Sequence, residues 1–115
     1  MIDRRKVLAK TDDHCAYCGC ELTMQTMQVD HIVPVIRWQG RREGRGTDDI
    51  DNLLPACRSC NNYKHTMDLE SFRQAIERWP DVLLRGCVTY KNAVRFGLVT
   101  PNPRKVTFYF EELPH

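Results

Sequence analysis

Four of the six cysteines stand in two Cys-x-x-Cys pairs, Cys15/Cys18 and Cys57/Cys60. The two-residue spacer lets both sulfurs of a pair turn toward one point, and four thiolates complete a closed tetrahedral site for Zn²⁺. Two disulfides or a redox-active pair are the alternatives. The N-terminus lacks the apolar stretch of an export signal, so we expect a reducing compartment and a structural zinc ion.

The two other cysteines carry separate expectations. Cys20 follows the first pair closely enough to compete as a zinc ligand. Cys87 lies in an apolar stretch, where a free thiol usually packs as a small core residue.

An acidic residue and a histidine, Asp30-His31, stand between the two cysteine pairs. Histidine has an unperturbed pKa of about 6.5, so a useful fraction is neutral at cellular pH and can act as a general base. The Asp30 carboxylate is a hard oxygen ligand that suits Mg²⁺ or Mn²⁺. An exposed acid beside a structural histidine at a turn is the alternative. A zinc ion bound by both cysteine pairs would bring Asp30-His31 close to residues 61–65, which favours a catalytic role for the two residues.

The bulk composition describes one ordinary globular domain. The chain has 115 residues, of which 42% are hydrophobic and 28% charged. A formal net charge of +2 is weak evidence for a nucleic-acid partner, so the argument for DNA depends on where the charges lie. No apolar run approaches a membrane span, so we expect no membrane partner and a place in the cytoplasm, the host's if the gene belongs to a phage.

The periodicity of the first half predicts short elements around these residues. We expect a basic helix over 2–10, strands over 26–30 and 51–56, and a helix that begins at the second cysteine pair and reaches His65. Side chains of Asp30 and His31 on a strand point to opposite faces, so both can serve one phosphate only if the chain twists there. Residues 37–49 are rich in glycine and arginine and indicate a long exposed loop.

The second half predicts two helices and a final strand. Asp68 is placed to cap a helix over 69–79 that Pro80 stops, and a third helix over 81–96 ends at Gly97. Residues 105–111 alternate apolar side chains on one face, which is typical of a strand. The expected fold class is therefore α+β, with flanking helices and a C-terminal strand.

Taken together, the motifs resemble the HNH nuclease family in its cysteine-flanked variety. The resemblance covers about residues 14–65 and is carried by the cysteine pairs, Asp30-His31-Ile32-Val33-Pro34, Asp51-Asn52-Leu53 and Asn61-Asn62-Tyr63-Lys64. It implies a ββα-metal (His-Me finger) core, over about residues 12–66, within a single domain 1–115. Residues 67–115 form an extension of that core.

The resemblance also implies a role for each motif residue. His31 is the general base and Asp30 a metal ligand, while Asn52 holds the catalytic loop by hydrogen bonds to backbone. Asn61 stands where the family often has histidine, and this oxygen donor leans the catalytic site toward Mg²⁺ or Mn²⁺. His65, one turn later, is a metal ligand, a phosphate contact or an exposed bystander, and Asn62 replaces Asn61 if the register slips by one.

DNA is the partner that the arginines favour. Glycines let the loop follow a phosphate backbone, and a solvated loop whose charges do little is the alternative. The expected DNA contacts are Arg37, Arg41, Arg42, Arg45, Arg58 and Lys64. The sequence thus predicts a metal-dependent DNA endonuclease. A zinc-stabilised DNA-binding module with weak or no catalysis, or an accessory subunit of a phage packaging or restriction system, is the alternative.

Overall fold

The computed structural model describes residues 1–35, 37–38, 41–42 and 46–114, without the side chains of 37–38 and 41–42. The chain divides into two compact units. The first consists of Met1–Leu69 and Thr107–His115, and the second of Glu70–Val106. The expected core over about 12–66 lies in the first unit, which also takes in the N-terminal helix and the last residues of the chain.

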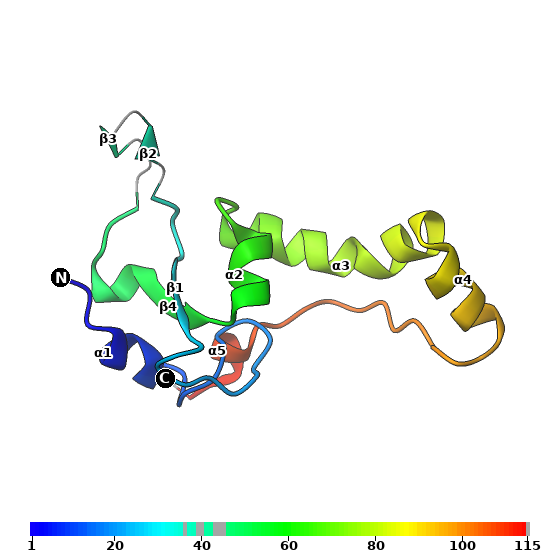
Figure 1. The fold of residues 1–115 in the computed structure, drawn as a ribbon, viewed down its shortest axis with the longest axis horizontal. Helices are drawn as coiled ribbons and strands as arrows, with labels where there is room; N and C mark the ends of the chain where they lie inside the picture. The colour runs from blue at the N-terminus through cyan, green and yellow to red at the C-terminus, as the bar shows by residue number, and fades with distance from the viewer. Residues whose placement is uncertain (36, 39–40, 43–45, 115) are drawn as a thin grey trace. The chain divides into compact units, whose positions relative to one another are not determined.

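The centre of the first unit is a pair of antiparallel strands followed by a helix (Figure 1). Strand β1 (Gln28–His31) pairs with β4 (Leu53–Ala56), and His31 lies opposite Leu53. All four residues of β4 are buried, and helix α2 (Arg58–Lys64) begins two residues after the strand ends. The structure therefore confirms both predicted strands and the helix after them, within a few residues.

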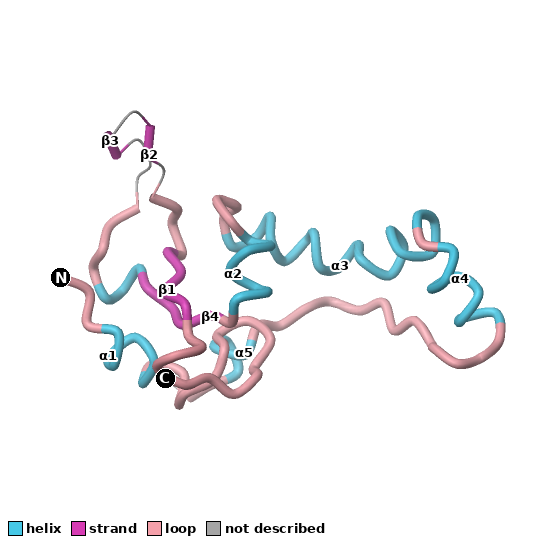
Figure 2. The backbone as a smooth tube through the Cα atoms, viewed as in Figure 1, coloured by secondary structure: helices cyan, strands magenta, loops and turns pink. Residues whose placement is uncertain are grey.

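The chain between β1 and β4, residues 32–52, leaves the sheet and returns to it, and we call this segment the excursion. Its backbone forms two short antiparallel strands, β2 (Arg37–Trp38) and β3 (Arg41–Arg42), so the expectation of a loop without strands was wrong for these residues (Figure 2). At the base of the excursion, Gly46 N donates a hydrogen bond to Pro34 O over 3.1 Å. A 3₁₀ turn, η1 (Ile50–Asn52), then leads into β4.

Helix α1 (Arg4–Ala9) braces this sheet. Asp3 caps it by accepting hydrogen bonds from two backbone N–H groups of the first turn, and Val7 and Leu8 are buried. Arg4 donates to two backbone carbonyls in the segment before β1, and Lys10 donates to carbonyls at the start of β4 and in the turn before it. The basic residues of this predicted helix therefore hold backbone segments together.

The C-terminal residues form helix α5 (Tyr109–Glu112), so the predicted strand over 105–111 was wrong. The N–H groups of Tyr109 and Phe110 donate to carbonyls in the turn that holds the first cysteine pair. Glu111 accepts a hydrogen bond from the N–H of Phe108, which begins the helix. The alternating aromatic rings therefore pack beside the cysteine turn: Tyr17 contacts Phe108 and Phe110 edge-on, with ring centroids 5.1 and 6.3 Å away.

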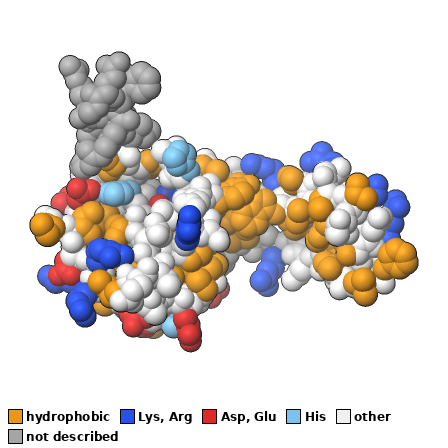
Figure 3. Space-filling view, in the orientation of Figure 1, with side chains coloured by type: hydrophobic (Ala, Val, Ile, Leu, Met, Phe, Trp, Pro, Cys, Tyr) orange, Lys and Arg blue, Asp and Glu red, His pale blue; other side chains and the backbone are white. Residues whose placement is uncertain are grey.

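The second unit consists mainly of helices α3 (Leu69–Gly86) and α4 (Val88–Arg95). Pro80 lies inside α3 rather than ending it, so the predicted stop at residue 79 was wrong, and α4 begins at Val88 rather than at residue 81. The exposed Asp81–Arg85 ion pair, at 2.6 Å, lies in the turn after the proline. Gly97, at a φ of +75°, ends α4 as predicted. Figure 3 shows one face of the protein, on which hydrophobic, basic and acidic side chains are interspersed with other surface. Among the described residues, no helix is long and apolar enough to span a membrane.

Gly46 provides a test of the closed excursion. A Cβ at this position would lie 2.1 Å from Val33 O, so the two stems approach each other too closely for any side chain. We expect Gly46→Ala to lower the free energy of unfolding by about 1–3 kcal/mol, because the backbone must shift to accept the methyl group. Urea denaturation measures this loss.

The matched control is Gly86→Ala, since a Cβ there meets nothing within 4 Å. This substitution should leave the stability unchanged or raise it slightly, because alanine restricts the unfolded chain. Equal stabilities of the two variants would contradict the close approach of the stems.

Candidate active site and thiol cluster

Five cysteines converge in the first unit. The sulfurs of Cys15, Cys18, Cys20 and Cys57 lie within 4.8 Å of one another, and those of Cys18 and Cys57 are 3.9 Å apart. Cys60 belongs to the same cluster through a hydrogen bond between its side chain and that of Cys15. Tetrahedral zinc with sulfurs at about 2.3 Å requires separations of this size. The cluster could therefore hold a structural metal such as zinc.

The proximity of these thiols strongly couples their ionisation. The hydrogen bond from Cys60 and several backbone N–H groups lower the pKa of Cys15 to about 4, against the opposing effect of burial. Burial and the neighbouring thiols raise the pKa of Cys20 to about 12. A divalent cation would stabilise every thiolate that it contacts, so neighbouring cysteines could be ionised at the same time. The donor set thus fits zinc, with Cys20 as a fifth thiol beside the four predicted ligands.

The Asp30 carboxylate lies at the centre of a buried polar cluster. Only 3% of its side chain is exposed, and Lys64, whose side chain is fully buried, places Nζ 3.1 Å from Oδ2. The Tyr17 hydroxyl donates a hydrogen bond to the same oxygen. Oδ1 lies 3.4 Å from Lys64 Nζ, a longer contact that leaves its lone pairs for another ligand.

Burial and partners act on Asp30 in opposite directions. Burial raises the pKa of this carboxyl, while the Tyr17 hydroxyl and the Lys64 ammonium both favour the charged form and oppose the rise. Burial and the charge of Asp30 also raise the pKa of Tyr17, so its hydroxyl remains a proton donor. The two partners therefore maintain the carboxylate in a place where water cannot solvate it.

His31 is the last residue of β1 and directly follows the buried Asp30. Its side chain is 25% exposed, and its Nε2 atom lies 2.8 Å from Oδ1 of Asp48. The backbone carbonyl of His31 accepts a hydrogen bond from Lys64 Nζ over 3.0 Å. A histidine ring oriented by a carboxylate and open to solvent is suited to accept a proton.

Asn52 joins the two sides of the excursion. Its Oδ1 accepts a hydrogen bond from Val33 N over 2.8 Å, and its Nδ2 donates to Val33 O over 3.1 Å and to Thr47 O over 2.8 Å. Val33 lies two residues after His31, and Thr47 directly precedes Asp48. The amide of Asn52 therefore fixes the backbone around both partners of the His31–Asp48 contact.

The candidate residues of α2 divide between surface and interior. Arg58 and Asn62 are exposed, and Asn61 is half-buried. Lys64 was expected to contact DNA, but it points inward to Asp30 and is fully buried, so in this structure it cannot reach a phosphate. His65 is exposed and caps the helix at a φ of +50°, which turns its Cβ away from the helical direction. His65 N still donates to Asn61 O over 2.9 Å, so the two residues remain one helical turn apart, and the shared face of their side chains stays a prediction.

The arginines of the excursion are described only in part. For Arg37, Arg41 and Arg42 the structure gives the backbone alone, in β2 and β3. Arg45 lies outside the described residues. Their expected contact with DNA therefore stays a prediction.

Two residues of the site were missed by the sequence reasoning. Asp48 follows Thr47 in an acidic turn, and its only signal was its place shortly before Asn52. Tyr17 lies between the two cysteines of the first pair, and its residue type gave no sign of a partner at Asp30. Both act through contacts between distant parts of the chain, which local patterns do not reveal.

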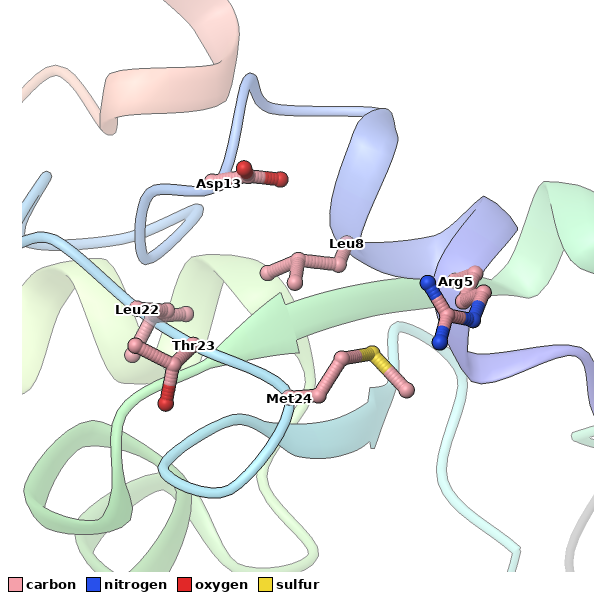
Figure 4. Close-up of a pocket in the computed structure, with 6 residues that line it drawn as sticks. All are labelled: Arg5, Leu8, Asp13, Leu22, Thr23 and Met24. Atoms are coloured by element: carbon pink, nitrogen blue, oxygen red, sulfur yellow. The ribbon is translucent and has the colours of Figure 1, made fainter.

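A pocket of about 320 Å³ lies elsewhere in the first unit. Figure 4 shows its lining side chains, which come from α1 and the segment before β1. They are Arg5, Leu8, Asp13, Leu22, Thr23 and Met24. Neither the Asp30 cluster nor His31 contributes to it, so the candidate active site is a surface around His31 rather than this pocket.

Comparison with known proteins now identifies this arrangement. Residues 15–67 match the sequence model of the family described as HNH endonuclease. This part of the chain is similar to an HNH domain. The match confirms the family resemblance and the α+β HNH fold that it implied, and it contains Asp30, His31, Asn52 and all of α2.

Known relatives share this HNH domain. The chain is 36% identical over 62 residues to the CRISPR-associated endonuclease Cas9 of Corynebacterium diphtheriae, and 31% identical over 71 residues to the Septu protein PtuB of Bacillus thuringiensis. These matches cover 53% and 54% of this chain. The crystal structure of the type II-C Cas9 enzyme from Actinomyces naeslundii matches 64% of the chain with a TM-score of 0.53 and 27% identity.

The relatives are much longer than the matched segment. The alignments cover 5% of the C. diphtheriae Cas9, 23% of PtuB and 7% of the A. naeslundii Cas9. The HNH domain is thus what this chain shares with them, and it supports nuclease activity in general.

The buried ion pair yields a stability prediction. We expect Lys64→Met to lower the free energy of unfolding by about 3–5 kcal/mol, because the buried Asp30 carboxylate loses its counter-charge. Lys91→Met is the matched control, since Lys91 is exposed on α4 and should change stability little. Urea denaturation followed by circular dichroism measures both variants, and equal stabilities would contradict the pairing of Lys64 with Asp30.

The thiol cluster yields a second prediction. We expect Cys57→Ser to lose bound zinc and much of the folded structure, because Cys57 lies in the cluster that joins the first cysteine turn to α2. Cys87→Ser should keep both, since Cys87 lies in the second unit. Elemental analysis and thermal melting provide the two measurements. Unchanged zinc content and melting in Cys57→Ser would exclude a structural role for zinc at this cluster.

Proposed function

We propose that this protein is a metal-dependent DNA endonuclease whose active site is the surface around His31. The observation that carries the proposal is a partly exposed histidine, bound to a carboxylate, that directly follows a buried aspartate at the end of a strand. The match of the surrounding residues to the HNH endonuclease family supports it. The identity of DNA as the substrate is part of the proposal.

His31 is the general base of the proposed reaction. Its ring removes a proton from a water molecule as the water attacks the phosphorus of a phosphodiester in line with the leaving oxygen. Asn52 holds the backbone on both sides of the histidine loop and so keeps the ring in place. The surface position of His31 leaves room for a long polymeric substrate, which an enclosed pocket would exclude.

Asp30 and Asn61 are the residues that would hold the catalytic ion, Mg²⁺ or Mn²⁺. Their donors are a carboxylate and an amide oxygen, which suit a hard cation, and Oδ1 of Asp30 has only its long contact with Lys64. When bound, the ion neutralises charge on the phosphate and on the departing oxygen. His65, at the end of α2, lies near enough in sequence to contact the ion or the phosphate.

The proposed DNA contacts are made by Arg58, which is exposed, and by the arginines of the segment between β1 and β4. Arg58 is exposed at the N-terminal end of α2, where its guanidinium and the helix terminus both favour a phosphate. The arginines at 37, 41, 42 and 45 are proposed to contact further phosphates along the DNA strand. Lys64 is left out of this set, because its charge is already engaged by Asp30.

One observation favours a second candidate function. Lys64 already neutralises Asp30, so the carboxylate does not depend on a metal ion for its counter-charge. This arrangement suits a zinc-stabilised DNA-binding or accessory module with weak catalysis. Such a module would act with a partner protein, for example in phage DNA packaging or in a restriction system.

A plasmid-nicking assay distinguishes the two functions. We expect the wild-type protein to convert supercoiled plasmid to nicked or linear DNA with Mg²⁺ or Mn²⁺, and chelation by EDTA to stop the reaction. His31→Ala should lower the rate by about 10²–10⁴-fold, the usual contribution of a general base, while DNA binding and zinc content persist.

His14→Ala is the control for loss of a histidine, since His14 stacks on Tyr109 and makes no contact with the site. Equal nicking by wild type and His31→Ala would exclude His31 as the base. Binding without cleavage under every ion would favour the accessory module.

A further inference from the structure

Asp48 places its carboxylate on the ring of His31. Its Oδ1 atom lies 2.8 Å from Nε2, and the two side chains are 47% and 25% exposed. We propose that Asp48 is a positioning residue that orients His31 and holds a proton on Nε2, so that Nδ1 is the atom that accepts the proton of the attacking water. This inference rests on the proposed role of His31 as the base.

The chemistry of the two groups assigns the proton. An ionised carboxylate only accepts hydrogen bonds, so Nε2 must be the donor in this contact. In the neutral imidazole the other ring nitrogen then carries the lone pair. The contact with Asp48 therefore selects one tautomer of His31 and, by fixing the ring, directs Nδ1 away from Asp48.

The backbone around Asp48 is held on both sides. Thr47 Oγ1 donates a hydrogen bond to Oδ2 of Asp49 over 3.0 Å and accepts one from Asp49 N over 3.3 Å. The carbonyl of Thr47 is bound by the amide of Asn52. Since the same amide also binds Val33 near His31, one side chain sets the spacing between the histidine and its carboxylate. The backbone that carries Asp48 is thus fixed by the fold.

The charge of Asp48 has two opposing effects on a nuclease. A carboxylate near the scissile phosphate repels the substrate and so raises KM. It also stabilises the imidazolium that forms as His31 takes the proton, an effect that is realised only in the transition state and so raises kcat. Removal of Asp48 should therefore lower kcat without raising KM, whereas loss of a DNA contact would raise KM.

Three variants test this split in the full-length protein with supercoiled plasmid DNA and Mg²⁺ or Mn²⁺. We expect Asp48→Ala to lower kcat by about 10–100-fold with KM unchanged or lower. Asp48→Asn should recover part of kcat, because the amide oxygen of asparagine can still accept a hydrogen bond from the N–H group at Nε2. Asp51→Ala removes a carboxylate from the same turn, where it lies beside Lys10 rather than His31, and should keep the wild-type rate.

The rates also define the result that would overturn the proposal. Faster cleavage by Asp48→Ala would show that the carboxylate obstructs the phosphate rather than serving the base. Equal loss in the Asp48→Ala and Asp51→Ala variants would show a general effect of charge in this turn. A rise in KM with kcat unchanged would place Asp48 in DNA binding instead.

The tautomer of His31 provides a test that requires no cleavage. In ¹⁵N-labelled wild-type protein, the long-range ¹H–¹⁵N spectrum should show the proton on Nε2 and a bare Nδ1, and Asp48→Ala should produce a mixture of the two tautomers. A proton on Nδ1 in the wild type would overturn the proposal. If the wild type cleaves no DNA, the proposed nuclease function fails while this spectrum still decides the role of Asp48.

Discussion

The geometry of the site depends on how a single buried carboxylate, that of Asp30, is neutralised. Tyr17 comes from the first cysteine turn, Asp30 from β1 and Lys64 from α2, and their side chains meet where water is excluded. A buried charge left without its partner costs several kcal/mol, so the three segments are stable only when they arrive together. Because Lys64 also binds the carbonyl of His31, the same ammonium fixes α2 against the exact strand end that carries the base.

The thiol cluster imposes the same constraint by a different interaction. It joins the turn over residues 15–20 to the start of α2, two of the three segments that meet at Asp30. The thiol cluster, which could hold a metal, and the buried ion pair therefore act on the same arrangement of strand, turn and helix. This redundancy explains how a first unit with a modest apolar core holds a site that must keep its shape.

Local pattern was sufficient where the partner of an element lay nearby in sequence. The two strands, the helix after the second cysteine pair and the cap at Gly97 follow from periodicity and turn chemistry, and the structure has them all. The strand predicted from the alternation around Phe108 and Phe110 was wrong. These rings pack on Tyr17, while the backbone of this segment donates hydrogen bonds to the first cysteine turn and forms a helix. That partner lies about ninety residues away, and periodicity within a segment does not contain it.

The same distinction applies to the candidate site. The chemical type of Lys64 suggested a phosphate contact, but the nature of a side chain does not say whether tertiary packing will bury it. The role of Asn52 was easier to predict, since a short amide side chain before a strand commonly forms hydrogen bonds to nearby backbone. Here it binds the backbone of Val33 and Thr47. Asp48 became visible only when the excursion closed and brought residues 31 and 48 together.

Lys64 and a catalytic ion need not compete for Asp30. Burial alone raises the pKa of this carboxyl and favours its neutral form, which binds a cation poorly. Lys64 and Tyr17 oppose that rise and so favour the anionic form, and Oδ1 makes the longer contact with Lys64, over 3.4 Å. Asp48 serves His31 in the same manner, because it maintains the state of the ring that the reaction requires. In both cases a neighbouring charge prepares a group whose environment would otherwise leave it in the wrong form.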